Sequence, residues 1–96
     1  MTTFDDLRQN PHPNWAGWQA MVYFDNGYCA SVIQSPHSYG GDKGLFEIGV
    51  GKGSDNNWSL CYDTPITSDV LGHLTEADVT RYLKEIEELP TYLLNV

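Results

Sequence analysis

The sequence predicts an α+β domain in which an antiparallel four-stranded β-meander packs against one C-terminal helix. Apolar and polar residues alternate on both sides of Asn26-Gly27, and again over 45–50 and 57–62, as in strands with one buried face. A capped segment with helical spacing of its apolar residues follows Thr75. The chain has 96 residues, of which 41% are hydrophobic, so we expect residues 1–96 to form a single domain.

The dipeptide Asn26-Gly27 separates the first two strands and is typical of a two-residue type I′ turn. Because side chains alternate between the faces of a strand, this turn fixes which residues share a face. The expected core face carries Trp18, Ala20, Val22, Phe24, Cys29, Ser31 and Ile33. The opposite face carries Gln19, Met21, Tyr23, Asp25, Tyr28, Ala30, Val32 and Gln34.

Met21, Tyr23, Tyr28 and Val32 are large side chains for a face that points to solvent. Two interpretations stay open. Either a helix or loop covers this face, or the face binds a partner protein, because aromatic residues and methionine are enriched at interfaces.

The third strand is expected over Leu45–Val50, and residues 51–56 are expected to form a turn because three of them are Gly or Asn beside Ser and Asp. The fourth strand is expected over Asn57–Tyr62. Residues 66–72 are compatible with a short edge strand or with an irregular segment that leads into the helix.

The C-terminal helix has a clear start and end. Thr75 is the expected N-cap, and Asp78 stands where a capping box has Glu. The apolar residues Val79, Tyr82, Leu83, Ile86 and Leu89 form one stripe, and Pro90 ends the helix. Residues 3–9 are compatible with a short N-terminal helix.

The tail 91–96 contains four large apolar residues. We therefore expect this tail to fold back on the domain or to be buried in a second copy, as a homodimer.

The formal net charge is −8, from 13 Asp and Glu against 5 Lys and Arg. This charge argues against direct binding of nucleic acid or anionic lipid, which require clustered cations. It is compatible with a basic protein partner and with solubility alone. No apolar run approaches the length of a membrane span and no signal peptide is evident, so we expect a cytoplasmic protein with Cys29 and Cys61 as free thiols.

Motifs for catalysis or for cofactors are not evident. His12, His37 and His73 match no zinc-binding spacing, and both cysteines look like small apolar residues rather than nucleophiles. We expect no enzyme activity, no metal and no cofactor.

The glycine-rich segment 37–44 is a second candidate binding surface. Tyr39, Asp42 and Lys43 lie there among glycines that allow close approach to the backbone.

Four segments together resemble small accessory proteins carried by bacteriophages and prophages: Asn10-Pro-His-Pro-Asn-Trp15, Val22-Tyr-Phe-Asp-Asn-Gly-Tyr28, Ser38-Tyr-Gly-Gly41 and Tyr62-Asp-Thr-Pro65. The resemblance implies a mobile-element origin and a soluble accessory role. Because small phage accessory proteins without catalytic motifs often bind and block a host protein, we expect this chain to bind and inhibit one, such as a CRISPR effector or another defence component. The expected partner-binding residues are Met21, Tyr23, Tyr28, Tyr39, Asp42 and Lys43. A virion or assembly component and a small-molecule binder or small enzyme are the alternatives.

Overall fold

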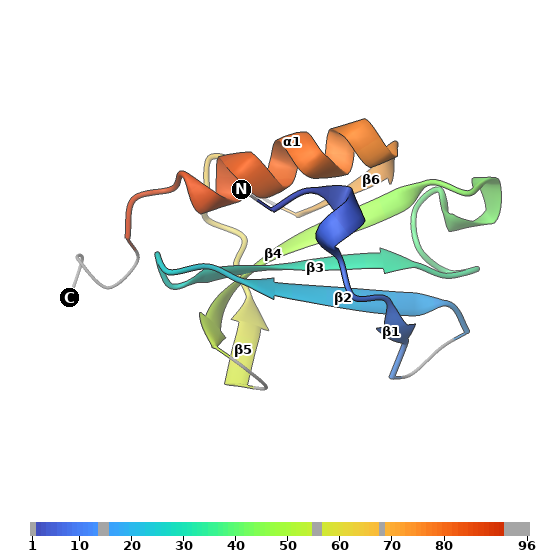
Figure 1. Ribbon diagram of the computed structural model, residues 1–96, viewed down its shortest axis with the longest axis horizontal. Coiled ribbons are helices and arrows are strands. Elements are labelled where there is room, and N and C mark those ends of the chain that lie inside the picture. The colour runs from blue at the N-terminus through green and yellow to red at the C-terminus, as the bar shows by residue number, and fades with distance from the viewer. Residues whose placement is uncertain (1, 14–15, 55–56, 68, 92–96) are drawn as a thin grey trace.

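The computed structural model describes residues 2–13, 16–54, 57–67 and 69–91, and the structural statements below concern these residues. Within them, a six-stranded antiparallel sheet packs against one α-helix (Figure 1). The elements are η1 (Phe4–Asp6), β1 (Asn10–Pro11), β2 (Trp18–Tyr23), β3 (Tyr28–Gln34), η2 (Gly41–Lys43), β4 (Phe46–Ser54), β5 (Asn57–Leu60), β6 (Val70–Leu74) and α1 (Glu76–Glu87). The predicted α+β class and the C-terminal helix are confirmed, whereas the number of strands is higher than predicted.

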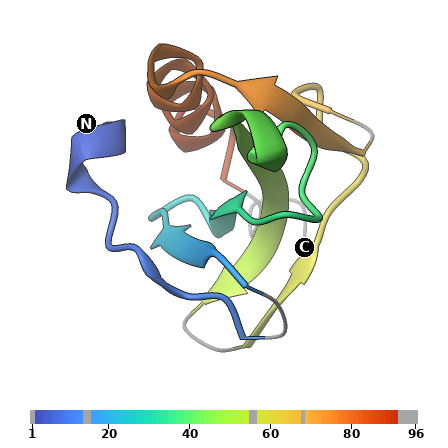
Figure 2. The ribbon, with the colours of Figure 1, turned by 90° about the vertical axis from the view of Figure 1, so that its right-hand side faces the viewer.

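Strand β4 organises the sheet. The strand order is β1-β2-β3-β4-β5, and β6 also pairs with β4. The first part of β4 pairs with β6 and the second part with β5. The sheet is curled, so β1 and β5 lie on the side away from α1 (Figures 1 and 2).

One prediction about this region was wrong, and of the two alternatives for the segment 66–72 the structure shows the strand, from Val70 on. The expected turn over 51–56 is largely strand, because β4 continues to Ser54. The ambiguous segment 66–72 contains the start of β6, which turns the predicted four-stranded meander into a larger sheet.

The β2–β3 hairpin has a loop that is one residue longer than predicted. Tyr23 pairs with Cys29 and Val22 with Ala30, and the amide of Phe24 donates to the carbonyl of Tyr28 at 2.9 Å. The loop therefore spans residues 25–27, with Gly27 at a φ of 89°. The two-residue turn was the wrong prediction, because Asn26 is held by the helix, as described below.

This register reverses the faces of β3 relative to the prediction. Cys29, Ser31 and Ile33 lie on the face away from α1, not on the core face. Ala30 and Val32 face the helix and are fully buried in the core. The predicted assignment of β2 holds, since Ala20 is buried in that core and Trp18 and Val22 pack against it.

The core lies between the sheet and α1. Its buried members are Ala20, Ala30, Val32, Phe46, Ile48, Val50, Leu74, Val79, Leu83 and Ile86. The helix contributes its predicted stripe, because Val79, Leu83 and Ile86 are fully buried.

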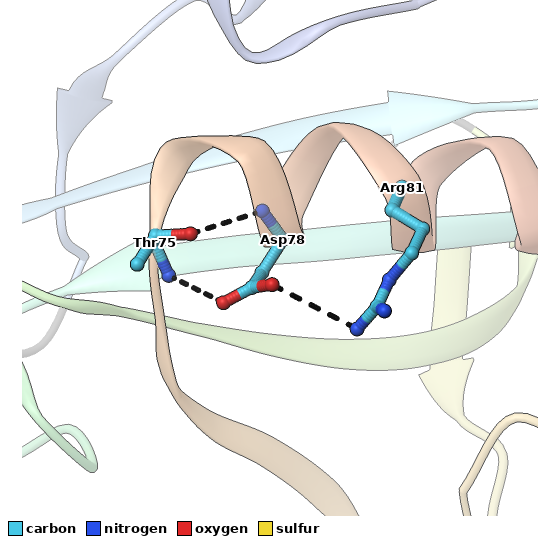
Figure 3. A network of polar contacts seen from close by, with 3 residues as sticks. All are labelled: Thr75, Asp78 and Arg81. Atoms are coloured by element: carbon cyan, nitrogen blue, oxygen red, sulfur yellow. Dashed lines mark hydrogen bonds and ion pairs between the residues drawn. The ribbon is translucent and has the colours of Figure 1, made fainter.

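The start of α1 follows the predicted capping pattern (Figure 3). The hydroxyl of Thr75 accepts from the amide of Asp78 at 3.2 Å, and the Asp78 carboxylate accepts from the amide of Thr75 at 3.0 Å. Arg81 lies 3.7 Å from the same carboxylate. These contacts satisfy amides that the first helical turn leaves without intrahelical partners.

The expected N-terminal helix is reduced to the short 3₁₀ turn η1. Thr3 and Asp6 form a second capping box, and the amide of Phe4 donates to Thr80 on α1 at 3.0 Å. The Phe4 ring lies 4.7 Å from that of Phe46, which fixes this segment against the core.

The end of α1 is held by Asn26 from the hairpin loop. The side-chain amide of Asn26 donates to the carbonyls of Ile86 at 2.8 Å, Glu87 at 3.1 Å and Leu89 at 3.1 Å. Its side-chain oxygen accepts from the amide of Tyr28 at 3.0 Å. One buried side chain thus satisfies carbonyls that the last turn of a helix leaves open.

Two further predictions concern the cysteines and the tail. Cys29 and Cys61 are buried and free, as predicted. The predicted packing of the C-terminal tail falls almost wholly on residues 92–96, which lie outside the described residues.

Candidate functional site

The face of the sheet opposite α1, here called the outer face, is built from rows of side chains that pair across the strands. The rows follow from the register of β2, β3 and β4. The first row is Gln19, Ile33 and Glu47; the second is Met21, Ser31 and Gly49; the third is Tyr23, Cys29 and Gly51.

A hollow of about 330 Å³ lies on this face, between the two ends of the curled sheet. On one side it is lined by His12 and Pro13, which follow β1. On the other side it is lined by Trp58 and Leu60 of β5 and by Val70 of β6. Its size is at the lower end of the roughly 300–1,000 Å³ of small-molecule sites, so it suits one large side chain or a small ligand.

Glycines of β4 form the floor of the outer face. A Cβ atom on Gly49 would lie 2.8 Å from Cδ2 of Leu60, and one on Gly51 would lie 2.7 Å from Cε3 of Trp58. Both separations are too short for non-bonded carbon atoms, so the side chains of β5 can lie over β4 only where β4 has glycine. The glycines therefore determine the shape of the hollow.

Polar groups of the first two rows line the hollow beside apolar ones. Gln19 donates its side-chain amide to the hydroxyl of Ser31 at 2.9 Å. Glu47 accepts from the backbone amide of Tyr39 at 2.9 Å through Oε1. Among the described residues, no lysine or arginine lines the hollow.

The six predicted partner-binding residues divide into three groups. Met21 and Tyr23 lie on the outer face, and Tyr23 is 36% exposed. Tyr28 does not share this face, because the longer hairpin loop turns it toward α1, where it packs against the core. The prediction of one face with Met21, Tyr23 and Tyr28 was therefore wrong for Tyr28.

The third group is the glycine-rich segment 37–44. Asp42 and Lys43 are exposed on η2, and Tyr39 is 61% exposed. The carbonyl of Tyr39 accepts from the amide of His73 at 3.0 Å, while its own amide donates to Glu47. The segment is therefore attached to the rim of the hollow through Glu47. Asp42 also borders a second hollow, of about 350 Å³, next to Gly17 and Gln34.

The thiols are poorly suited to nucleophilic chemistry. Burial, and secondarily the charge of Cys61, raises the pKa of Cys29 to about 11. Burial also raises the pKa of Cys61, whose thiol donates to the Asp63 carboxylate at 2.7 Å. Both cysteines are therefore protonated at neutral pH, whereas the thiolate is the reactive form.

Within the described ranges, no three His, Cys, Asp or Glu side chains gather closely enough to hold a metal ion. In the same part of the chain, no helix is long and apolar enough to cross a membrane.

Sequence reasoning missed most residues of the hollow, including Ser31, Ile33 and Glu47. The first two were assigned to the core through the wrong register. One signal was present: Gly49, Gly51 and Gly53 alternate along β4, and Gly51 and Gly53 pair with the large residues Leu60 and Trp58 of β5. Alternating glycines inside a strand indicate side chains packed closely over one face.

No protein-family model, curated protein or solved structure matches this chain. The proposals below therefore depend on the geometry and chemistry of the described residues.

Proposed function

We propose that the protein is a non-enzymatic binding protein that engages a basic partner protein through its outer face. The observation that carries this proposal is the apolar hollow between β1 and β5. Leu60 lines this hollow and is 39% exposed, and Tyr23, elsewhere on the outer face, is 36% exposed. Such residues at the edge of an apolar depression are typical of interaction surfaces.

The charge of the chain supports a basic partner. The sequence carries a net charge of −8, and Glu47 brings a carboxylate to the hollow itself. Complementary charge accelerates encounter with a cationic surface and disfavours anionic ones. The exposed Tyr39 extends this surface, because its backbone is bonded to Glu47.

At the next level of detail, we propose that the partner is a host protein and that binding inhibits it, as the resemblance to phage and prophage accessory proteins implies. A defence component such as a CRISPR effector fits this role. Insertion of a partner side chain into the hollow would cover part of the partner's surface and so compete with its own ligands.

Affinity capture from a bacterial host lysate tests the proposal, with the wild-type chain and two matched variants as baits. Leu60→Lys adds an ammonium group beside the hollow, where it should repel a cationic partner, and Ala77→Lys adds one on exposed α1, on the far side of the sheet. A bacterial host protein should be retained by the wild-type chain and by Ala77→Lys but lost with Leu60→Lys. The purified host protein should then lose activity when the wild-type chain is added. Equal retention by all three baits would refute the outer face as the binding surface.

The glycine-rich segment is tested separately by changing Tyr39 and Lys43 together to Ala. We expect weaker binding of the same partner with little change in thermal stability, because both side chains are exposed. If the double variant bound the partner with unchanged affinity, the segment 37–44 would not be part of the binding surface.

A small-molecule binder is the second candidate function. The polar groups of Gln19, Ser31 and Glu47 converge on a hollow of about 330 Å³, as in small-ligand sites. A metabolite that raised the melting temperature of the wild-type chain, but not that of Leu60→Lys, would favour this candidate over a protein partner.

A further inference from the structure

We infer that the hollow is a subsite for an arginine side chain of the partner protein, an inference that rests on the proposed function. The lining of the hollow combines three features that a single side-chain type satisfies. Its walls are apolar, its polar groups accept hydrogen bonds, and it contains a carboxylate.

The apolar part comes from three strands. Ile33 of β3, Leu60 of β5 and Val70 of β6 line the hollow, and Gly49 forms the floor between them. The aliphatic part of an arginine side chain packs well on such surfaces while its charged end stays near polar groups.

The polar part is rich in acceptors. Ile33 pairs with both Gln19 and Glu47, so the amide and the carboxylate flank Ile33 in one row. Gln19 uses its amide nitrogen to bond Ser31, which leaves its carbonyl oxygen as an acceptor. The guanidinium group carries several N–H donors and no acceptor, so it matches this set.

Other side chains fit less well. A neutral apolar side chain would bury the Glu47 carboxylate with no opposite charge beside it, although its Oε1 atom accepts from the Tyr39 amide, and such burial is costly. A lysine ammonium is more strongly hydrated than a guanidinium and loses more when it enters an apolar hollow. Acidic side chains would be repelled by Glu47.

The probe for this inference is the blocked peptide acetyl-Gly-Arg-Gly-amide, titrated into the labelled full chain and followed by amide NMR. The matched ligand replaces arginine by citrulline, which keeps the shape and removes the charge. We expect the arginine peptide to shift the amides of Ile33 and Gly49 and the indole signal of Trp58, and the citrulline peptide to bind about tenfold more weakly.

Two variants locate the charge. Glu47→Gln keeps an oxygen that accepts from the Tyr39 amide, so the fold should persist while the arginine peptide binds about tenfold more weakly. Glu85→Gln removes the same charge from the exposed side of α1 and should leave binding unchanged. Equal binding of the two peptides, or equal effects of the two variants, would overturn the inference.

Free L-arginine separates a protein side chain from a metabolite. Its α-ammonium and α-carboxylate groups are both strongly hydrated and would lose water beside the apolar walls of the hollow, so we expect it to bind more weakly than the blocked peptide. If free arginine bound more tightly than the blocked peptide, the hollow would be a site for the free amino acid and not for an arginine side chain of a partner protein. If no arginine ligand binds while Leu60→Lys still abolishes partner retention, only this inference fails and the proposed function stands.

Discussion

Asn26 offers the sharpest test of how this fold is held together. It is the only described side chain that bonds the end of α1 from the sheet side, and it is 8% exposed. Asn26→Ala removes all of these bonds and leaves the helix carbonyls and the Tyr28 amide without this partner. Asn26→Asp keeps the shape but replaces the donating amide with a carboxylate.

The expected magnitude follows from the contacts. Both hydrogens of the amide group are shared among three carbonyls, and the side-chain oxygen accepts a further bond. Counting this as three net hydrogen bonds at about 0.5–1.5 kcal/mol each gives roughly 1.5–4.5 kcal/mol for Asn26→Ala. A domain of this length has about 5–14 kcal/mol of stability, so the variant should still fold.

Asn26→Asp should lower the free energy of unfolding further at neutral pH. A carboxylate there would face carbonyl oxygens at the negative end of the helix dipole, which adds repulsion to the lost bonds. Urea unfolding followed by circular dichroism measures both variants. Asn10 provides the matched control, because its exposed side chain makes only a 3.4 Å contact with the Arg8 carbonyl among the described residues. If Asn26→Ala falls within about 0.5 kcal/mol of Asn10→Ala, the side chain does not hold the helix.

Three further predictions concern the core, the helix start and the thiols. Leu83→Ala should cost about 2–5 kcal/mol of stability because Leu83 is fully buried, and a loss like that of a surface substitution would contradict the packing of α1. Hydrogen bonds from Thr75 lower the pKa of Asp78, so stability from this cap is present above the unfolded value of 3.8 and is lost as the pH falls through the lower folded pKa. In Asp78→Asn, the melting temperature should fall less as the pH is lowered than it does in the wild-type chain. If it falls equally in both, the Thr75–Asp78 cap does not cause this loss of stability. Cys29 and Cys61 should react slowly with a thiol reagent at neutral pH and rapidly in denaturant, whereas rapid reaction of the folded chain would refute their burial.

The helix could be predicted from the sequence because its signals are local. Thr75 and Asp78 lie one helical turn apart, and the stripe that contains Leu83 repeats with the helical period. Such patterns depend little on the rest of the fold, so the N-cap and the buried residues agree with the structure.

The register of the hairpin could not be predicted in the same way. Asn26-Gly27 favours a two-residue turn locally, but Asn26 gains contacts with Ile86 and Leu89, which lie far along the chain. These contacts exist only after α1 has packed on the sheet. A tertiary contact thus outweighed the local turn preference.

The candidate site was missed for a related reason. Gly51 and Gly53 looked like turn residues, since glycine is depleted from strands. In the structure they are strand residues whose missing side chains make room for Trp58. Only the pairing of β4 with β5 distinguishes these two uses of glycine.

The hairpin loop links the stability of the fold to the shape of the candidate site. Because the loop has one residue more than a two-residue turn, Ala30 and Val32 face α1 while Ser31 and Ile33 face the hollow. A two-residue loop would exchange these pairs, since a shift of one residue moves a whole strand to its other face. It would bury the hydroxyl of Ser31 in the core and remove an acceptor from the hollow. The bonds from Asn26 to α1 hold the longer loop in place, so the same side chain that ends the helix also determines which residues of β3 a partner can reach.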